Sequence, residues 1–130
     1  MYNVKHDDRH KARLVARGHL TDVPAESVYS GVVSLRSLRI CIFLAELNGL
    51  RVHAANIGKA YLEAKNKEKV YIIGGPDFGE LEGHTLVIHK ALYSLRSSGL
   101  RWHEKFANTL CDMGFTPSKA DPDAQERQYL

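Results

Sequence analysis

The clearest pattern in the chain is a helical repeat of apolar residues between Leu35 and Asn48. Four of these residues fall on one face of a helix with 3.6 residues per turn: Leu35, Leu38, Ile42 and Ala45. Asn48 and Gly49 follow, and both residue types are common at helix C-termini. The pattern therefore predicts a helix over residues 35–48.

A second helix is predicted to start near residue 98. Ser97 and Ser98 can cap its N-terminus, and Gly114 stands where a glycine commonly ends a helix. The apolar residues between these signals have helical spacing: Leu100, Trp102, Phe106, Leu110 and Met113. Residues 115–130 show little periodicity.

Four segments have the alternating or β-branched character of strands: residues 10–18, 50–57, 69–73 and 84–90. The last two are separated by GGPDFGELEG, which predicts a hairpin connection because it lacks the GK[ST] ending of a phosphate-binding loop. Strands and helices in this order predict an α+β (mixed α/β) fold, with a mixed sheet packed against two main helices.

Composition limits the class of protein. The chain has 130 residues, of which 44% are hydrophobic and 25% charged, so it is neither disordered nor fibrous. This length suits one domain over residues 1–130 and is short for a multi-domain enzyme. We expect the chain to be part of something larger.

The net charge is only +3, but the basic residues are clustered. One cluster lies near the N-terminus and a second lies between residues 90 and 105: Lys5, Arg9, Lys11, Arg13 and Arg17, then Lys90, Arg96, Arg101 and Lys105. Two such patches can converge on a polyanion, although for so modest a charge a solvated surface is the simpler reading.

Neither the cysteines nor the apolar stretches indicate secretion or a membrane. Cys41 and Cys111 are isolated and lie in predicted helices, so we expect buried, reduced thiols. The longest apolar run, residues 40–47, is far shorter than a membrane span. No targeting signal is apparent, and we expect a soluble intracellular protein, cytoplasmic or nuclear.

Four blocks of sequence point to a family. They are KARLVARG (11–18), the stretch from SGVVSL to AYLEA (30–64), KVYIIGGPDFG (69–79) and KALYSLRSSGLRWHEKFANTLCDMGF (90–115). In this order and spacing they resemble the reverse transcriptase of Ty1/copia-type retrotransposons. The resemblance implies the fingers and part of the palm of a right-hand polymerase, belonging to a retrotransposon polyprotein. It also implies RNA-directed DNA synthesis with Mg²⁺, dNTP and an RNA or DNA primer–template.

The resemblance assigns roles to individual residues. Lys11 and Arg13 match positions near the incoming triphosphate, and which of them contacts phosphate is left open. Tyr61 matches the aromatic residue that stacks under the sugar and rejects a 2′ hydroxyl. Arg96 and Ser98 match the loop that faces the nucleotide and template.

The departures from the family pattern concern catalysis. Asn56, followed by Ile57, stands where the family has a metal-binding aspartate in a D-[IV]-x-x-A-[FY]-L motif, and an amide is a poor Mg²⁺ ligand. Lys59 adds a positive charge nearby, and Ser94 replaces a usual glycine. The sequence also ends before the [YF]-x-D-D motif, the thumb and the RNase H domain. We therefore expect no retained metal site and no catalytic activity.

Other polar residues have simpler readings. Asp121 and Asp123 are predicted to be turn residues rather than substitutes for the missing carboxylates. His6 and His10 could share a helical face as metal ligands, but no third ligand follows, and a frayed terminus is the simpler reading. The remaining histidines are expected to be packing or surface residues: His53, His84, His89 and His103.

Two alternatives to an inactive polymerase region stay open. The chain could be a non-catalytic nucleic-acid-binding module, or a relic without function. It could also expose apolar surface and an unpaired strand edge, and associate through them.

Overall fold

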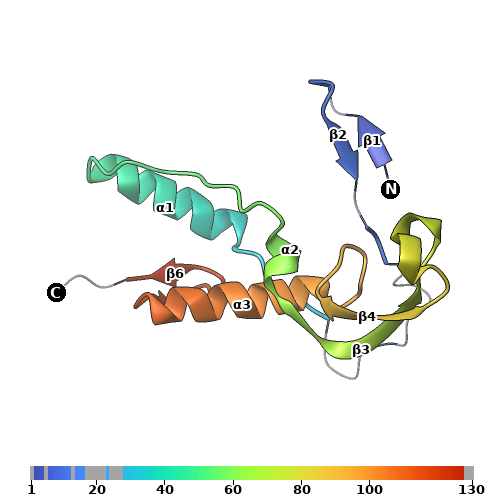
Figure 1. Ribbon diagram of the computed structural model, residues 1–130. Helices are drawn as coiled ribbons and strands as arrows, with labels where there is room; N and C mark the ends of the chain where they lie inside the picture. The colour runs from blue at the N-terminus through green and yellow to red at the C-terminus, as the bar shows by residue number, and fades with distance from the viewer. Residues whose placement is uncertain (1, 5, 13, 17–22, 24–27, 128–130) are drawn as a thin grey trace. The chain divides into compact units, whose positions relative to one another are not determined.

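The computed structural model describes residues 2–4, 6–12, 14–16, 23 and 28–127. The chain divides into two compact units, here called unit 1 (Met1–Tyr29 with Lys59–Trp102) and unit 2 (Ser30–Gly58 with His103–Leu130). Figure 1 shows the helices and strands of both. The mixture of helices and strands confirms the α+β composition expected from the sequence.

Unit 1 is built around a β-hairpin. Its elements, in chain order, are β1 (Tyr2–Val4), β2 (His10–Ala12), α2 (Ala60–Glu63), β3 (Lys65–Ile73), the 3₁₀ helix η2 (Pro76–Leu81) and β4 (Thr85–Lys90). Strands β3 and β4 pair antiparallel, with Val70 opposite Ile88 and Tyr71 opposite Val87. Strands β1 and β2 form a second antiparallel pair. The hairpin predicted across GGPDFGELEG is confirmed, and β3 begins four residues earlier than predicted.

Unit 2 contains the predicted helices. Its elements are α1 (Leu35–Leu47), α3 (Ser98–Asp112, which begins in unit 1), β5 (Thr116–Pro117) and β6 (Gln125–Glu126). Helix α1 starts where the Ser34 hydroxyl accepts a hydrogen bond from the Ser37 backbone N–H, at 3.1 Å. Gly49 and Gly114 follow the two helices with φ of 61° and 85°, the left-handed conformation that suits glycine at a helix C-terminus. Both helix predictions are confirmed.

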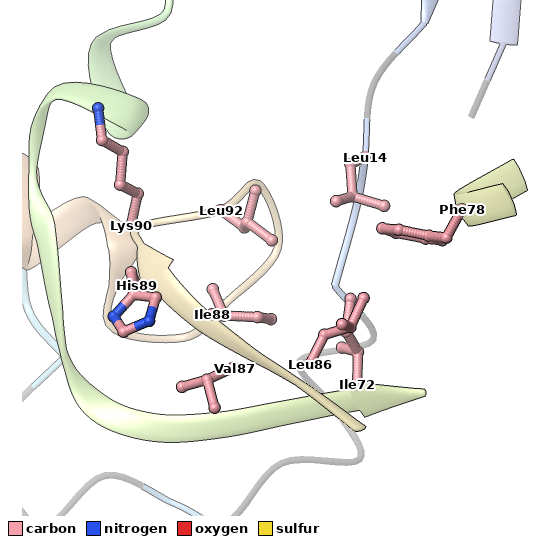
Figure 2. Close-up of a pocket in the computed structure, with 9 residues that line it drawn as sticks. All are labelled: Leu14, Ile72, Phe78, Leu86, Val87, Ile88, His89, Lys90 and Leu92. Atoms are coloured by element: carbon pink, nitrogen blue, oxygen red, sulfur yellow. The ribbon is translucent and has the colours of Figure 1, made fainter. Parts of the chain in front are cut away.

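The core described for unit 1 lies on the inner face of the hairpin. Ile88, Leu95 and Ala16 are buried there, and Val70, Ile72 and Leu92 pack against them. Figure 2 shows the same side of the hairpin around an apolar cavity of about 310 Å³, with Leu14 and Phe78 opposite Ile88. The β-branched residues of β3 and β4 alternate between this face and solvent, as strand geometry requires.

The predicted strand over residues 50–57 is wrong. This segment is exposed and belongs to no ladder, so Asn56 does not end a strand. The expected mixed sheet is also wrong, because the described strands form three separate antiparallel pairs. A strand requires a partner for its backbone N–H and C=O groups, and an alternating sequence does not guarantee one.

Smaller predictions also need correction. Cys41 and Cys111 are free thiols as expected, but both are exposed rather than buried. His10 lies in β2, so no helical face joins it to His6. Of the predicted strand over residues 10–18, β2 covers His10–Ala12, Val15 forms an isolated bridge with Tyr93, and residues 13, 17 and 18 lie outside the described residues. Within the described part of the chain, no helix has the length and apolar character needed to cross a membrane.

Candidate functional site

The segment that carries Asn56 offers a poor donor set for metal. Asn56 and Ile57 are exposed and lie in unit 2, without regular secondary structure around them. The only side-chain oxygen at this position is a neutral amide, whereas Mg²⁺ prefers carboxylates. Among the described residues, no three His, Cys, Asp or Glu side chains gather into a metal-binding group. Asn56 is therefore a poor match for a magnesium ligand, and the loss of the metal site stays a prediction.

Tyr61 lies in unit 1, in a different unit from Asn56. It occupies the short helix α2, which begins after Lys59 in a left-handed conformation with φ of 56°. Its half-buried ring meets the ring of Tyr93 edge to face, with centroids 5.3 Å apart and planes at 72°. The backbone N–H of Ala91 donates to the carbonyl of Ala64 at 3.0 Å, which ties α2 to the end of β4. The structure thus joins the aromatic residue of the first motif to the KALYSL block.

The loop from Tyr93 to Ser98 exposes one charged side chain and buries two serines. Arg96 is exposed, whereas Ser97 and Ser98 are buried. The Ser98 hydroxyl donates to the carbonyl of Leu92 at 2.6 Å, so it closes the loop on itself. A ligand contact by Arg96 stays a prediction. A nucleotide contact by Ser98 stays a prediction, and the hydroxyl could donate to a nucleotide only by leaving its backbone partner.

Ser94 stands where the family usually has a glycine. Its φ is 70°, in the left-handed region that glycine adopts without steric cost. The loop therefore keeps the backbone conformation that suits a glycine while carrying a side chain.

The basic N-terminal block approaches the same loop through its backbone. Val15 forms a parallel bridge with Tyr93, and the N–H of Ala16 donates to the carbonyl of Tyr93 at 3.0 Å. Lys11 lies in β2 opposite Asn3. Arg13 lies outside the described residues. Phosphate contacts by Lys11 or Arg13 stay predictions.

Sequence reasoning missed a polar cluster beneath this loop. The Ser97 hydroxyl donates to Glu68 Oε2 at 3.2 Å, and Arg101 Nη2 lies 3.8 Å from Glu68 Oε1. Arg101 is 4% exposed and sits in the first turn of α3, so the pair joins β3 to that helix. Ser97 directly precedes α3, at the predicted N-cap position, and the N–H of Arg101 donates to its carbonyl at 3.0 Å. The only sequence signal was a lone glutamate among lysines in KNKEK.

The two aspartates near the C-terminus organise unit 2. The Asp121 carboxylate accepts hydrogen bonds at Oδ2 from the Ser37 hydroxyl at 2.6 Å and the Ser34 N–H at 2.9 Å. These bonds, chiefly that of Ser37, lower the pKa of Asp121 to about 2. The Asp123 carboxylate lies 2.8 Å from His103 Nε2. The prediction of turn residues is confirmed, because the N–H of Ala124 donates to the carbonyl of Asp121.

Comparison with known proteins identifies the family. The family profile described as "Reverse transcriptase (RNA-dependent DNA polymerase)" matches residues 1–125, and the chain belongs to this family. Two similar proteins are Gag-Pol polyproteins of Saccharomyces cerevisiae (strain ATCC 204508 / S288c), those of transposons Ty1-NL2 and Ty1-BL. They are 35% and 34% identical over 118 and 112 residues, covering 87% and 85% of this chain.

The match covers 7% and 6% of these two polyproteins, so the chain corresponds to a small part of their length. The family match and the transposon relatives confirm the resemblance to Ty1/copia-type reverse transcriptases. No solved structure matches the chain.

Proposed function

We propose that this chain is the fingers and partial palm region of a Ty1/copia-type reverse transcriptase and does not itself catalyse nucleotide transfer. The parent activity is RNA-directed DNA synthesis from dNTP on a primer–template, as part of a retrotransposon polyprotein. One observation carries the claim of inactivity: Asn56 occupies the position of the family's metal-binding aspartate.

The physical reason is electrostatic. Polymerases of this kind use divalent metal ions to neutralise charge that develops on the phosphates. A neutral amide removes one of the negative charges that hold these ions, and Lys59 adds a positive charge three residues later. The sequence also contains no [YF]-x-D-D motif to supply the other carboxylates.

The unit 1 residues retain features suited to binding. The ring of Tyr61 packs edge to face against the ring of Tyr93, and the exposed Arg96 lies on the adjoining loop. Under this proposal, Arg96 pairs with phosphate of the nucleotide or template, and Tyr61 lies beneath the sugar of the incoming dNTP. Arg96 suits this task because its guanidinium group can donate two parallel hydrogen bonds to a phosphate.

The direct test is primer extension by the purified chain on a primed RNA template with Mg²⁺ or Mn²⁺. No incorporation above a heat-killed control is expected. Asn56→Asp alone should not restore activity, because the second carboxylate motif is absent from the sequence. Nucleotide incorporation by the unmodified chain would overturn the proposal.

A chimera isolates the contribution of Asn56. Residues 1–125 of this chain would replace the matching segment in the reverse transcriptase of the Ty1-NL2 polyprotein, with either Asn56 or Asn56→Asp. We expect the chimera with the Asn56→Asp substitution to be at least about a hundredfold more active than the other, the scale of losing one electrostatic contact in a transition state. If the two chimeras incorporate nucleotide equally well, Asn56 is not the cause of inactivity.

A further inference from the structure

Strand β3 separates charges that are mixed in the sequence. The segment KNKEK reads as three lysines with a glutamate among them, but exposed and half-buried residues alternate along the strand. Lys65, Lys67 and Lys69 are exposed, whereas Asn66 and Glu68 are half-buried. The folded strand therefore presents three positive charges on its exposed positions.

The glutamate of this segment is engaged elsewhere. Its carboxylate accepts a hydrogen bond from the Ser97 hydroxyl and lies near the buried guanidinium group of Arg101. The asparagine beside it donates to the Glu68 backbone carbonyl at 2.8 Å. The Glu68 side chain thus lies on the inner side of the strand, and its negative charge faces away from the exposed lysines.

An aromatic ring continues the row of lysines. Tyr71 is the next exposed residue of β3 at 56% exposure, and it pairs across the hairpin with Val87, at 44% exposure. Exposed aromatic rings beside basic side chains are typical of surfaces that bind single-stranded nucleic acid, because every base has a face that can stack.

The row of lysines is long enough to contact more than one phosphate of a nucleic-acid strand. Alternate residues on a β-strand lie about 6.8 Å apart, twice the rise of about 3.4 Å per residue. Successive phosphates of one strand of a nucleic-acid helix lie about 3.4 Å apart along its axis. The pairing of β3 with β4 is irregular between Lys65 and Val70, so no fixed register with the phosphates is implied, but side chains at this separation can each reach a different phosphate of one strand.

We propose that the exposed face of β3 binds single-stranded nucleic acid, with Lys65, Lys67 and Lys69 on its phosphates and Tyr71 under a base. This surface lies outside the positions matched to the nucleotide and template in the family. The inference rests on the proposed function only in taking nucleic acid as the partner, and it adds a contact that the family motifs do not assign.

Fluorescence anisotropy of the full chain with a labelled single-stranded oligonucleotide at several salt concentrations tests the proposal. The variant Lys65→Gln, Lys67→Gln, Lys69→Gln should bind more weakly and reduce the slope of log K against log salt by about 2, since each phosphate contact contributes about 0.7. Replacing the same lysines by arginine should preserve both affinity and slope. Tyr71→Leu should weaken binding roughly tenfold without changing the slope.

The control variant removes the same charge from exposed residues of unit 2: Arg36→Gln, Arg39→Gln and Lys119→Gln. It should bind like the unmodified chain, which excludes a general effect of net charge. Circular dichroism would establish that every variant is folded.

Each contrary outcome is distinct. If the unmodified chain binds and the lysine variant binds equally well, the β3 surface is refuted while the nucleic-acid partner stands. If that variant instead forms larger species on size-exclusion chromatography without losing affinity, the lysines serve only to prevent pairing at an open strand edge. If the unmodified chain does not bind even at low salt, both the surface and the proposed partner are refuted.

Discussion

The β3–β4 hairpin of unit 1 and helix α1 of unit 2 differ in whether their apolar residues are buried. The hairpin turns Ile88 inward, where it is buried with Leu95, and exposes lysines on β3. None of the thirteen residues of α1 is buried, and Phe43 remains 62% exposed. Both elements were predicted correctly from their sequence patterns, but only one of them contributes to a core.

The difference teaches that periodicity predicts an element without predicting its burial. Apolar residues stabilise a fold only when another layer removes them from water, at about 25 cal/mol per Å². Apolar residues lie around most of the surface of α1, a composition typical of a core helix, yet none of them is buried. Within the described residues, we therefore expect the hairpin side of the molecule to carry more of the stability than α1.

The largest expected effect tests the polar cluster behind the hairpin. Glu68→Ala removes the half-buried carboxylate that faces the buried Arg101, and leaving that guanidinium group without this partner costs about 2–3 kcal/mol. Urea unfolding followed by circular dichroism measures this loss. Glu63→Ala, at an exposed position of α2, is the control and should change the free energy of unfolding by less than about 0.5 kcal/mol. Equal effects of the two substitutions would contradict the assignment.

A close approach in unit 2 provides a second test. A Cβ atom at Gly31 would meet the Asp123 carboxylate, which is held by His103. Gly31→Ala should therefore lower the free energy of unfolding by about 1–3 kcal/mol. Gly58→Ala is the matched control, because no atom lies within 4 Å of its added Cβ. A neutral Gly31→Ala would mean that the Asp123 turn tolerates displacement, and that unit 2 lacks this local constraint.

The left-handed serine of unit 1 predicts a gain in stability. Ser94→Gly removes the contact between Cβ and the following carbonyl that disfavours φ of 70° in other residues. The greater freedom of glycine in the unfolded chain offsets part of this gain, so a net increase of about 0.5–1 kcal/mol is expected. Thermal unfolding would detect it. A loss of stability would indicate that the Ser94 side chain makes a contact worth more than the strain.

Asp121 should contribute to stability in a defined pH range. Its folded-state pKa of about 2 lies below the ordinary value of 3.8, because Ser37 and Ser34 donate hydrogen bonds to the ionised carboxylate. The contribution is therefore fully present above pH 3.8 and is lost as the pH falls towards 2. Acid unfolding monitored by circular dichroism should show a steeper loss of helix in the unmodified chain than in Asp121→Asn. Identical acid profiles would refute this role.

The smallest effect is expected in α1 itself. Phe43→Ser replaces an exposed ring, so the free energy of unfolding should change by less than about 0.5 kcal/mol. Unfolding in urea provides the measurement. A loss above about 2 kcal/mol would show that Phe43 is buried in solution, and it would end the contrast between α1 and the hairpin.

Local signals explain which elements the sequence predicted. The ends of α1 and α3 depend on neighbouring residues such as Ser34, Gly49 and Gly114, and the hairpin depends on alternation within two short segments. The strand predicted over residues 50–57 had the right alternation, but nothing in its own sequence could report that it lacks a partner.

The arrangement of the site depended on contacts between distant residues. Asp121 and Ser34 are 87 residues apart, and Ser97 and Glu68 are 29 apart, so no spacing rule joins them. The resemblance pointed to Tyr61, but the ring of Tyr93 that braces it emerged only from the fold. The roles assigned to Lys11, Arg13, Arg96 and Ser98 stay predictions.

The positions of the two cysteines offer a way to observe one half of the molecule alone. Cys41 and Cys111 are the chain's only cysteines, both are exposed, and both belong to unit 2. A thiol-reactive dye would therefore label the native sequence in unit 2 without engineering, while the single tryptophan, Trp102, supplies an intrinsic signal from unit 1. Thermal unfolding followed by the dye signal and by tryptophan fluorescence would reveal whether unit 1 and unit 2 unfold together or in succession.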